Sequence, residues 1–453
     1  MSRKVNRREF INTAVGATAL AGGGARAFAA KPKRPNVLFI LADDLGYGDL
    51  SCYGRPDYRT PVLDAFAKQG IKFMSAYAAA PVCTPTRCAY ITGRYPQRLR
   101  VGLEVLTGTS PADVGLPPDH PTIASLLKND GYDTAIVGKW HLGWTPEFGP
   151  NRHGFDEFFG LLSGAADYFT HKSPTMPDAG DVPGGIPDLW ENLAPIERVG
   201  YLTDLLSDKA AAYVARPRTK PFFLSLQYNA PHSPWEGPED AAIDHTTHGV
   251  EAMIQGGSRK IYGAMMKSMD AGVGRVLKAL ERAKLERDTL VIFTSDNGGV
   301  RYSFNWPFSF TKGTLWEGGT RVPAMVRWPG VVPAARSTDQ AAITMDWTAT
   351  ILAATGTAAD PSYPLDGQDL MPVCTGKRAA YDRTLFWRTS LLDAARMGRW
   401  KYLKNADRES LFDLSDDEGE KVDLHTRHPD VFAQIKAQYL AWNARMLPKP
   451  QPL

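Results

Sequence analysis

The sequence has few cysteines, no long apolar run and no internal repeat. Four cysteines among 453 residues, Cys52, Cys83, Cys88 and Cys374, are too few for a disulfide-built scaffold. A hydrophobic core must therefore supply the stability, although four cysteines in an exported protein would ordinarily form two disulfides. The apolar stretch near the amino terminus, residues 14–22, is too short and too rich in glycine to span a membrane.

The first thirty residues carry the features of an export signal rather than of a folded segment. Arg3, Lys4, Arg7 and Arg8 form a basic head, and Arg7-Arg8-Glu9-Phe10-Ile11 resembles the twin-arginine motif. Ala27-Phe28-Ala29 then offers a small-residue cleavage site. We expect a signal peptide over residues 1–29, export by the twin-arginine route to the periplasm or beyond, and no stable membrane anchor after cleavage. A disordered basic tail is the alternative.

The mature chain also lacks a net charge of one sign. The whole sequence carries +3, and residues 1–29 contain five basic residues and one acidic residue, so the remainder carries about −1. This balance gives no electrostatic reason to expect a nucleic acid or an anionic membrane as partner. A hydrophobic content of 43% is ordinary for a soluble globular protein, and the length allows two to three domains.

Continuous apolar runs alternate with segments of helical spacing. The runs cover residues 36–41, 134–137, 222–226 and 289–294, and the helical segments cover residues 60–68, 121–129, 202–215 and 260–283. Because each run is continuous rather than alternating, we expect strands buried on both faces of one sheet. The pattern predicts an α/β fold whose sheet is covered by helices on both sides, with ligands gathered at the carboxyl ends of its strands.

After about residue 365 the pattern changes to short strands. Residues 383–387, 395–403 and 410–414 are each predicted to form one antiparallel strand, and a helix is predicted from Pro429 to about Met446. We therefore expect a catalytic domain over residues 30–365 and a smaller carboxyl-terminal α+β subdomain over residues 366–453.

Acidic and amide side chains follow two of the buried runs. Asp43 and Asp44 come directly after the first run, and Asp296 and Asn297 come after the last. Adjacent carboxylates repel one another unless a cation or nearby bases neutralise them. Oxygen-only ligands favour Ca²⁺ or Mg²⁺ over zinc, so the four residues are a candidate metal site. A solvated loop or a helix cap is the alternative for either pair alone.

Two motifs suggest chemistry at the same edge. The first is Cys83-Thr84-Pro85-Thr86-Arg87, followed by Ile91-Thr92-Gly93-Arg94, and the second is Val137-Gly138-Lys139-Trp140-His141. Lys139 and His141 are two residues apart in an extended segment, so their side chains point the same way. A buried cysteine beside a turn proline is the alternative for the first motif, and a surface lysine with a core histidine for the second. His232 follows another buried run, and Lys312 lies in the segment 310–323.

These motifs, in this order, resemble the formylglycine-dependent sulfatases, whose relatives include alkaline phosphatase. The resemblance runs from about residue 34 to the carboxyl terminus and implies an alkaline-phosphatase-like mixed sheet flanked by helices, with an antiparallel sheet in the carboxyl-terminal subdomain. It implies that a formylglycine-generating enzyme converts Cys83 to formylglycine and that Arg87 steadies its hydrate. Thr86, where serine is commoner, and Tyr90 depart from the usual motif.

The resemblance also assigns roles to the remaining charged residues. Asp43, Asp44, Asp296 and Asn297 would hold a divalent cation, usually calcium. Lys139, His232 and Lys312 would grip the sulfate or protonate the leaving oxygen, and His141 would serve the formylglycine hydroxyl. If Cys83 is modified, three cysteines remain and one must be unpaired.

The substrate is expected to be a small-molecule or saccharide sulfate ester. The segment 162–171 looks like parts of enzymes related to N-acetylgalactosamine-6-sulfatase and arylsulfatase. Within it Ser163 matches a further active-site serine, and Asp167 and His171 are candidate contacts to sugar hydroxyls. Ordinary loop packing is the alternative for each of these, as it is for three tryptophans placed to stack on a ring, Trp144, Trp235 and Trp306.

Two other functions remain open from the sequence. A phosphoester hydrolase of the same superfamily would use an unmodified nucleophile and often two zinc ions held by histidines. A non-catalytic carbohydrate-binding relative would keep the fold without the reaction. Cys83 in its motif and the oxygen-only ligand set favour a sulfatase.

Overall fold

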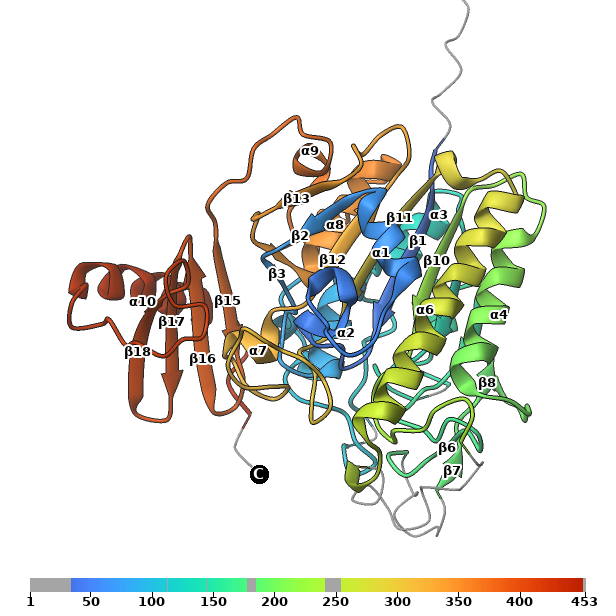
Figure 1. The fold of residues 1–453 in the computed structure, drawn as a ribbon, viewed down its shortest axis with the longest axis horizontal. Coiled ribbons are helices and arrows are strands. Elements are labelled where there is room, and N and C mark those ends of the chain that lie inside the picture. The colour runs from blue at the N-terminus through green and yellow to red at the C-terminus, as the bar shows by residue number, and fades with distance from the viewer. Residues whose placement is uncertain (1–33, 112, 145, 177–184, 241–253, 451–453) are drawn as a thin grey trace, which may run out of the picture. The chain divides into compact units, whose positions relative to one another are not determined.

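A ten-stranded mixed sheet forms the centre of the chain (Figure 1). The computed structural model describes residues 34–111, 113–144, 146–176, 185–240 and 254–450, so the predicted signal peptide lies outside the described residues. The strand order across the sheet is β13 (Arg336–Thr338), β2 (Ile71–Phe73), β12 (Ala324–Arg327), β11 (Thr289–Ser295), β1 (Asn36–Ala42), β10 (Phe222–Gln227), β4 (Asp133–Gly138), β5 (Glu157–Gly160), β8 (Trp190–Glu191) and β9 (Ala194–Pro195).

The four apolar runs identified in the sequence are neighbouring strands at the middle of this sheet. β11, β1, β10, β4 and β5 pair in parallel, whereas antiparallel pairs join β12 and β8 to the two sides of this group. Parallel pairing brings the carboxyl ends of the five strands to one edge of the sheet. The expected α/β fold with a mixed central sheet is confirmed.

Alternate residues along each strand feed two separate cores. Leu38 and Ile40 of β1 pack with α1 (Pro61–Lys68), α4 (Leu202–Ala215) and α6 (Arg259–Arg282), and α4 and α6 run side by side on that face in Figure 1. Val37 and Phe39 pack instead with helices of the other face, α2 (Cys83–Thr92), α3 (Ile123–Asn129) and α8 (Thr344–Thr355). Burial on both faces explains why these strands are continuously apolar.

Four helices lie where helical spacing predicted them. Thr60 precedes Pro61 at the start of α1, and α4 has the predicted bounds. α3 begins after Thr122, whose side chain accepts a hydrogen bond from the Ser125 backbone N–H, so Pro121 lies before the helix rather than in it. The hydroxyl cap satisfies an amide group that the first helical turn leaves unpaired.

A separate four-stranded antiparallel sheet follows residue 365. It contains β15 (Thr384–Arg388), β16 (Leu392–Met397), β17 (Trp400–Asn405) and β18 (Arg408–Asp413), and α10 (Pro429–Asn443) packs on it. The prediction of a single strand over residues 395–403 is wrong, because Gly398 adopts a positive φ of 58° and turns the chain between β16 and β17. Two-residue hairpin turns need such conformations, which glycine supplies at little cost.

Short elements complete the described chain. Two-stranded sheets pair β3 (Ala76–Tyr77) with β14 (Ala342–Ile343) and β6 (Lys172–Ser173) with β7 (Ile186–Pro187). Two further helices are α7 (Glu317–Thr320) and α9 (Met371–Cys374). All four cysteines lie within the described residues and each is a free thiol, so the structure contains neither of the two disulfides that four cysteines would ordinarily form. Within the described ranges, no helix combines the length and the apolar character needed to cross a bilayer.

Candidate active site

Polar residues that follow four neighbouring strands lie together at one edge of the main sheet. Asp43 and Asp44 follow β1, Asp296 and Asn297 follow β11, and the pairing of Ala42 with Ser295 aligns the ends of these two strands. Lys139 and His141 follow β4, while His232 follows β10. Parallel pairing therefore gathers residues that are far apart in the sequence.

Cys83 is the first residue of α2, at the edge of this group. Its side chain is 2% exposed and its Sγ lies 3.6 Å from Asp43 Oδ1. Burial raises the pKa of the Cys83 thiol to about 11, against the opposing effect of nearby lysines, so the thiol is protonated near neutral pH.

Arg87 lies one helical turn after Cys83 and bonds to residues at the ends of three strands, β11, β10 and β4. Its Nε and Nη2 donate to Asp296 Oδ2 at 3.1 and 2.8 Å, and its Nη1 donates to Gln227 Oε1 at 2.7 Å and to the Lys139 carbonyl at 3.1 Å. The guanidinium is fully buried. Only the planar fork of an arginine supplies so many fixed donors, which fits the position to arginine rather than lysine.

Two lysines pair with the carboxylates that follow β1. Lys139 Nζ lies 2.6 Å from Asp43 Oδ2, and Lys312 Nζ lies 2.6 Å from Asp44 Oδ1. Burial raises the pKa of Asp43, but Lys139, His232 and Arg87 outweigh it and hold that pKa well below the usual range. Burial, with Asp43 close by, raises the pKa of Asp296 to about 7. The carboxylates of Asp43, Asp44 and Asp296 are thus paired with Lys139, Lys312 and Arg87, and their charges nearly cancel.

The two histidines occupy different environments. His141 has a φ of 58° and is buried, with its Nε2 2.8 Å from the Leu106 carbonyl, whereas its Nδ1 has no hydrogen-bond partner among the described residues. Burial and the charge of Lys139 lower its pKa well below the usual value. His232 is 15% exposed, and its Nε2 lies 3.6 Å from Asp44 Oδ2 while its Nδ1 lies 2.7 Å from the Ser233 carbonyl.

The donor set of this edge fits a hard divalent cation. Asp43, Asp44, Cys83 and His232 each bring one potential ligand atom within 4.8 Å of the others. Asn297 Nδ2 donates to Asp44 Oδ1 at 2.7 Å, and the buried Asn297 Oδ1 finds no partner among the described residues. A buried, unpartnered carbonyl oxygen beside carboxylates is the arrangement that a calcium or magnesium ion would complete.

A cavity of about 480 Å³ opens above Cys83. Asp44, His141, His232 and Lys312 line it near the thiol. Most of its remaining walls are apolar, from Val105, Leu106, Ala165, Trp235, Ile254 and Val300, with Thr107, Thr175, Ser233 and Arg301 as polar exceptions. The cavity therefore joins a charged floor to a largely apolar mouth, the general form of a small-molecule site.

Comparison with known proteins identifies the family of this chain. The family model described as Sulfatase matches residues 35–357. The chain is 33% identical to the steryl-sulfatase of Mus musculus, over 93% of this chain and 84% of that protein. The chain belongs to the sulfatase family. Members of this family are sulfuric ester hydrolases, and hydrolysis of sulfate esters is the activity of this enzyme.

Other relatives agree with this assignment. This sulfatase is 34% identical to the N-acetylgalactosamine-6-sulfatase of Canis lupus familiaris, over 82% of the chain and 72% of that protein. The crystal structure of Ps i-CgsB in complex with k-i-k-neocarrahexaose is 32% identical with a TM-score of 0.82, covering 92% of this chain and 95% of that one. The phosphonate monoester hydrolase of Agrobacterium radiobacter, 21% identical with a TM-score of 0.66, shares the fold.

Three residues predicted to bind substrate are not among the lining residues of the cavity in this sulfatase. Ser163 Oγ donates to the Ala165 carbonyl at 3.0 Å, and Asp167 Oδ1 accepts from the backbone N–H groups of residues 169 and 170. His171 Nε2 lies 3.0 Å from the Gly200 carbonyl. All three side chains are buried and bonded within the protein, so their contact with substrate stays a prediction. Of the three tryptophans, Trp235 lines the cavity.

Sequence reasoning missed two residues that fix the geometry of the sulfatase site. Gln227, the last residue of β10, holds Arg87 through its side chain and Lys139 through its carbonyl, which accepts the Lys139 N–H at 2.9 Å. A Cβ on Gly138 would lie 1.7 Å from that carbonyl oxygen, so only glycine fits there. The second missed residue is Leu106, which contributes only its backbone carbonyl, as the partner of His141. A polar residue ending an apolar run was the available signal for Gln227, but a backbone contact leaves no trace in the sequence.

Proposed function

We propose that this sulfatase hydrolyses sulfate monoesters with a formylglycine made from Cys83 and a divalent cation, calcium or alternatively magnesium, held by Asp43, Asp44, Asp296 and Asn297. The observation that carries the proposal is the position of Cys83. It starts α2 on the floor of the cavity, and the same helix presents Arg87 to the acidic cluster.

The formylglycine and the bound cation would supply the nucleophile and positive charge. Hydrated formylglycine at position 83 would supply a hydroxyl nucleophile, and a cation held by the acidic cluster would supply positive charge for the sulfate oxygens. The protein's own cations add to this effect. Lys139 and Lys312 already lie in hydrogen-bonding distance of Asp43 and Asp44. Neutralising these carboxylates would leave both ammonium groups to bind sulfate, where fixed charges lower the barrier.

The histidines suit two proton transfers. The contact between His141 Nε2 and the Leu106 carbonyl requires a proton on Nε2, which leaves Nδ1 with a lone pair and no partner. His141 can therefore accept a proton from a hydroxyl on residue 83, since both residues line one cavity. His232, which is partly exposed and lies 3.6 Å from Asp44 Oδ2, would protonate the leaving oxygen.

The proposed substrate is a sulfated saccharide, with an aryl or steryl sulfate as the second candidate. Names of relatives support the first, through N-acetylgalactosamine-6-sulfatase and the neocarrahexaose complex. The apolar walls of the cavity and the similarity to steryl-sulfatase favour the second. A panel of 4-nitrophenyl sulfate, N-acetylgalactosamine 6-sulfate, neocarrahexaose and a steryl sulfate separates the two by their kcat/KM values.

The remaining sequence predictions complete this proposal. Residues 1–29 would direct the folded enzyme through the twin-arginine route to the periplasm or beyond, after a formylglycine-generating enzyme has acted on Cys83. Residues 30–365 would form the catalytic domain and residues 366–453 the carboxyl-terminal subdomain. Normal export of an Arg7-Arg8→Lys-Lys variant would refute the export route.

Mass spectrometry of the tryptic peptide Phe73–Arg87, from protein made in its own host, tests the nucleophile. We expect a mass shift from thiol to aldehyde or its hydrate at Cys83, together with hydrolysis of an aryl sulfate that the Cys83→Ala variant loses. An intact cysteine, in a host that modifies a control sulfatase, would refute the formylglycine mechanism. Faster hydrolysis of the matching aryl phosphate would favour a phosphoester hydrolase.

A further inference from the structure

A second cavity, of about 720 Å³, adjoins the catalytic one. Val105 and Thr107 line both cavities. The chain neighbours of the catalytic residues also contribute to the second cavity. Pro81 and Val82 precede Cys83, while Gly313 follows Lys312, and their backbones are joined by a hydrogen bond of 2.9 Å from the Gly313 N–H to the Pro81 carbonyl. The second cavity therefore lies directly beside the reacting centre.

The far wall of this cavity comes from the carboxyl-terminal sheet. Thr389, Ser390 and Leu391 form the turn between β15 and β16, and Asn405, the last residue of β17, lies beside it through its pairing with Leu392. Leu391 is 64% exposed. The sheet that carries none of the charged catalytic residues thus supplies one side of a cleft that begins next to Cys83.

The lining of the second cavity mixes polar with apolar side chains and is nearly uncharged. Hydroxyl and amide groups come from Thr107, Thr109, Ser110, Thr314, Ser390 and Asn405. Trp316 adds an aromatic ring, which packs against Phe310 at a centroid distance of 4.4 Å and so has a fixed orientation. Of the two charged residues in the lining, Arg388 is bonded to Asn443 and to the Leu447 carbonyl, and Glu104 is exposed.

Neutral hydroxyls, an amide and one aromatic face match the chemistry of uncharged sugar units. Sugar hydroxyls exchange hydrogen bonds with such groups, while the C–H face of a ring packs on an aromatic side chain. A second sulfate group would need a cation here, and the one cation in this lining is already engaged. A steryl or aryl group would contact only the apolar part of this lining.

We propose that the second cavity binds the saccharide units next to the sulfated sugar, so that the enzyme acts on sulfated oligosaccharides in preference to sulfated monosaccharides. This inference rests on the proposed function, because it takes the sulfate ester to lie over Cys83. The carboxyl-terminal sheet then takes part in substrate selection through Ser390, Leu391 and Asn405.

Two variants and a matched control test this proposal. Ser390→Trp fills the cavity, and Asn405→Ala removes one of its amide groups. Ser362→Trp places the same bulky side chain at an exposed serine that lines neither cavity. For each protein, kcat/KM is measured on N-acetylgalactosamine 6-sulfate, on a chondroitin 6-sulfate tetrasaccharide and on neocarrahexaose. Hydrolysis of 4-nitrophenyl sulfate reports the sulfate site alone.

We expect the wild-type enzyme to prefer an oligosaccharide over the monosaccharide by at least about tenfold in kcat/KM, a difference that corresponds to about 1.4 kcal/mol. Ser390→Trp should reduce this preference to near one and Asn405→Ala should reduce it severalfold, both with an unchanged rate on 4-nitrophenyl sulfate. Ser362→Trp should keep the preference. Equal use of oligosaccharide and monosaccharide by the wild type, or a preference that survives Ser390→Trp, overturns the inference. If the wild-type enzyme hydrolyses none of these sulfate esters, the proposed function itself is refuted.

Discussion

At the scale of single residues, Arg87 joins α2 to the acidic cluster. It contacts Asp296, Gln227 and the Lys139 carbonyl without any exposed surface. Replacing Arg87 by alanine leaves the Asp296 carboxylate buried without its base, which typically costs about 3–5 kcal/mol. We predict a loss of that size in the free energy of unfolding of Arg87→Ala, measured by urea denaturation in the presence of a chelator.

A surface ion pair provides the comparison for this prediction. Arg275 Nη2 lies 2.6 Å from Asp204 Oδ1, and both side chains are more than a third exposed. Exposed pairs contribute about 0–1 kcal/mol, because water and salt screen them. Arg275→Ala should therefore change stability little. A similar small change for Arg87→Ala would show that Asp296 does not depend on this base.

His232 is predicted to act as the acid for the leaving group. Positioned acid–base groups contribute about 10²–10⁴-fold to rate, and most when the leaving group is a poor one. His232→Ala should therefore lower kcat strongly on a sugar sulfate and much less on 4-nitrophenyl sulfate, whose phenolate leaves without a proton. Equal losses on both substrates would indicate that His232 binds the sulfate instead of protonating the leaving oxygen.

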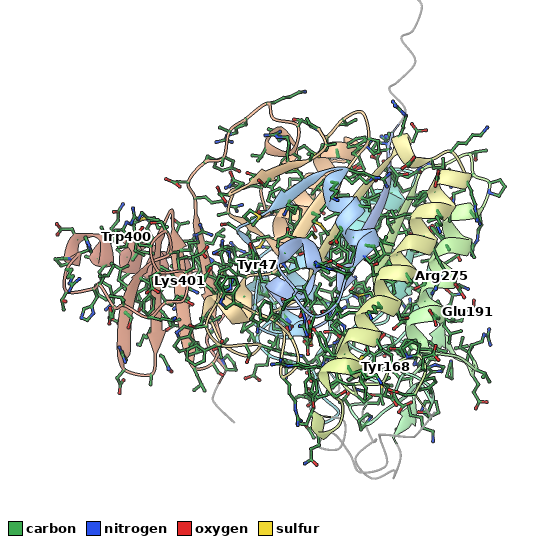
Figure 2. The ribbon with its side chains drawn as sticks, viewed as in Figure 1. Tyr47, Tyr168, Glu191, Arg275, Trp400 and Lys401 are labelled. Atoms are coloured by element: carbon green, nitrogen blue, oxygen red, sulfur yellow. The ribbon has the colours of Figure 1, made fainter. Side chains whose placement is uncertain are left out.

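Glu236 gives the protein a pH-dependent stability. Its Oε2 accepts the Tyr168 N–H at 2.9 Å, and burial, together with the nearby Asp167, raises the pKa of Glu236 from 4.5 to about 8. Between these two values the folded protein binds the extra proton, so stability is full below pH 4.5 and is lost as the pH rises through 8. Tyr168 lies in the lower part of Figure 2, near the loop that Asp167 closes.

The prediction for Glu236 follows from this sign. The free energy of unfolding should fall by up to ~1.4 kcal/mol per pH unit from this group as the pH rises from about 6 to 8. The melting temperature should fall with it. A glutamine at the position keeps the acceptor for Tyr168 and a donor for Asp167 but cannot ionise. Glu236→Gln should flatten the slope. A slope unchanged by this substitution would assign it to other groups.

At the scale of elements, the sequence predicts the strands that carry the site better than the contacts between them. Runs such as residues 36–41 and 289–294 are buried on both faces, so their composition alone marks them, and the polar residues that follow show where each strand ends. The order in which these strands pair is set by packing of distant segments. No local pattern shows that β10 lies between β1 and β4, which is what places Gln227 beside Arg87.

The same limit explains where the sequence reading fails. The single strand expected over residues 395–403 is a hairpin because Gly398 turns the chain, and the alternation on either side of it hides the break. Tyr90 is unusual for the motif but has a packing role, with its ring 3.9 Å from that of Phe39 and its hydroxyl 3.2 Å from Ser225 Oγ. The role of Tyr90 depends on partners distant in the sequence, whereas the turn at Gly398 is local.

A buried charge network connects the carboxyl-terminal sheet to the segment that carries Lys312. Lys401 of β17, which Figure 2 labels, is buried. Its Nζ lies 2.8 Å from Glu317 Oε1 of α7 and 2.7 Å from Glu420 Oε1. Tyr77 OH also donates to Glu317 Oε2 at 2.6 Å. Because α7 begins five residues after Lys312, we infer that Lys401 positions the segment that holds this lysine.

Removing Lys401 tests this connection. Lys401→Met leaves the buried Glu420 without its base and Glu317 with Arg321 alone, so we predict a loss of about 3–5 kcal/mol in the free energy of unfolding. If Lys401 also positions Lys312, KM for 4-nitrophenyl sulfate should rise at temperatures well below the melting transition. The matched control is Lys404→Met, a partly exposed lysine on the same strand. A loss of stability with unchanged KM would restrict Lys401 to a structural role.

At the scale of the whole molecule, one cation would stabilise strands that otherwise bring like charges together. Asp43, Asp44 and Asp296 meet where β1 and β11 end, so the centre of the sheet carries three buried carboxylates. A ligand that binds only the folded state stabilises it by about 2.7 kcal/mol at a concentration 100 times its Kd. We predict that calcium raises the melting temperature of chelator-treated protein and restores its sulfatase activity.

Two aspartate variants separate site-specific binding from a general effect of salt. Asp296→Asn removes one charged ligand and should abolish most of the calcium-induced rise in melting temperature. Asp204→Asn changes an exposed aspartate paired with Arg275 and should leave that rise intact. Magnesium should stabilise the protein less, because this ion demands a stricter octahedral geometry and gives up its water reluctantly. If neither chelator nor calcium changes the melting temperature or the activity, Lys139, Lys312 and Arg87 neutralise the three carboxylates on their own.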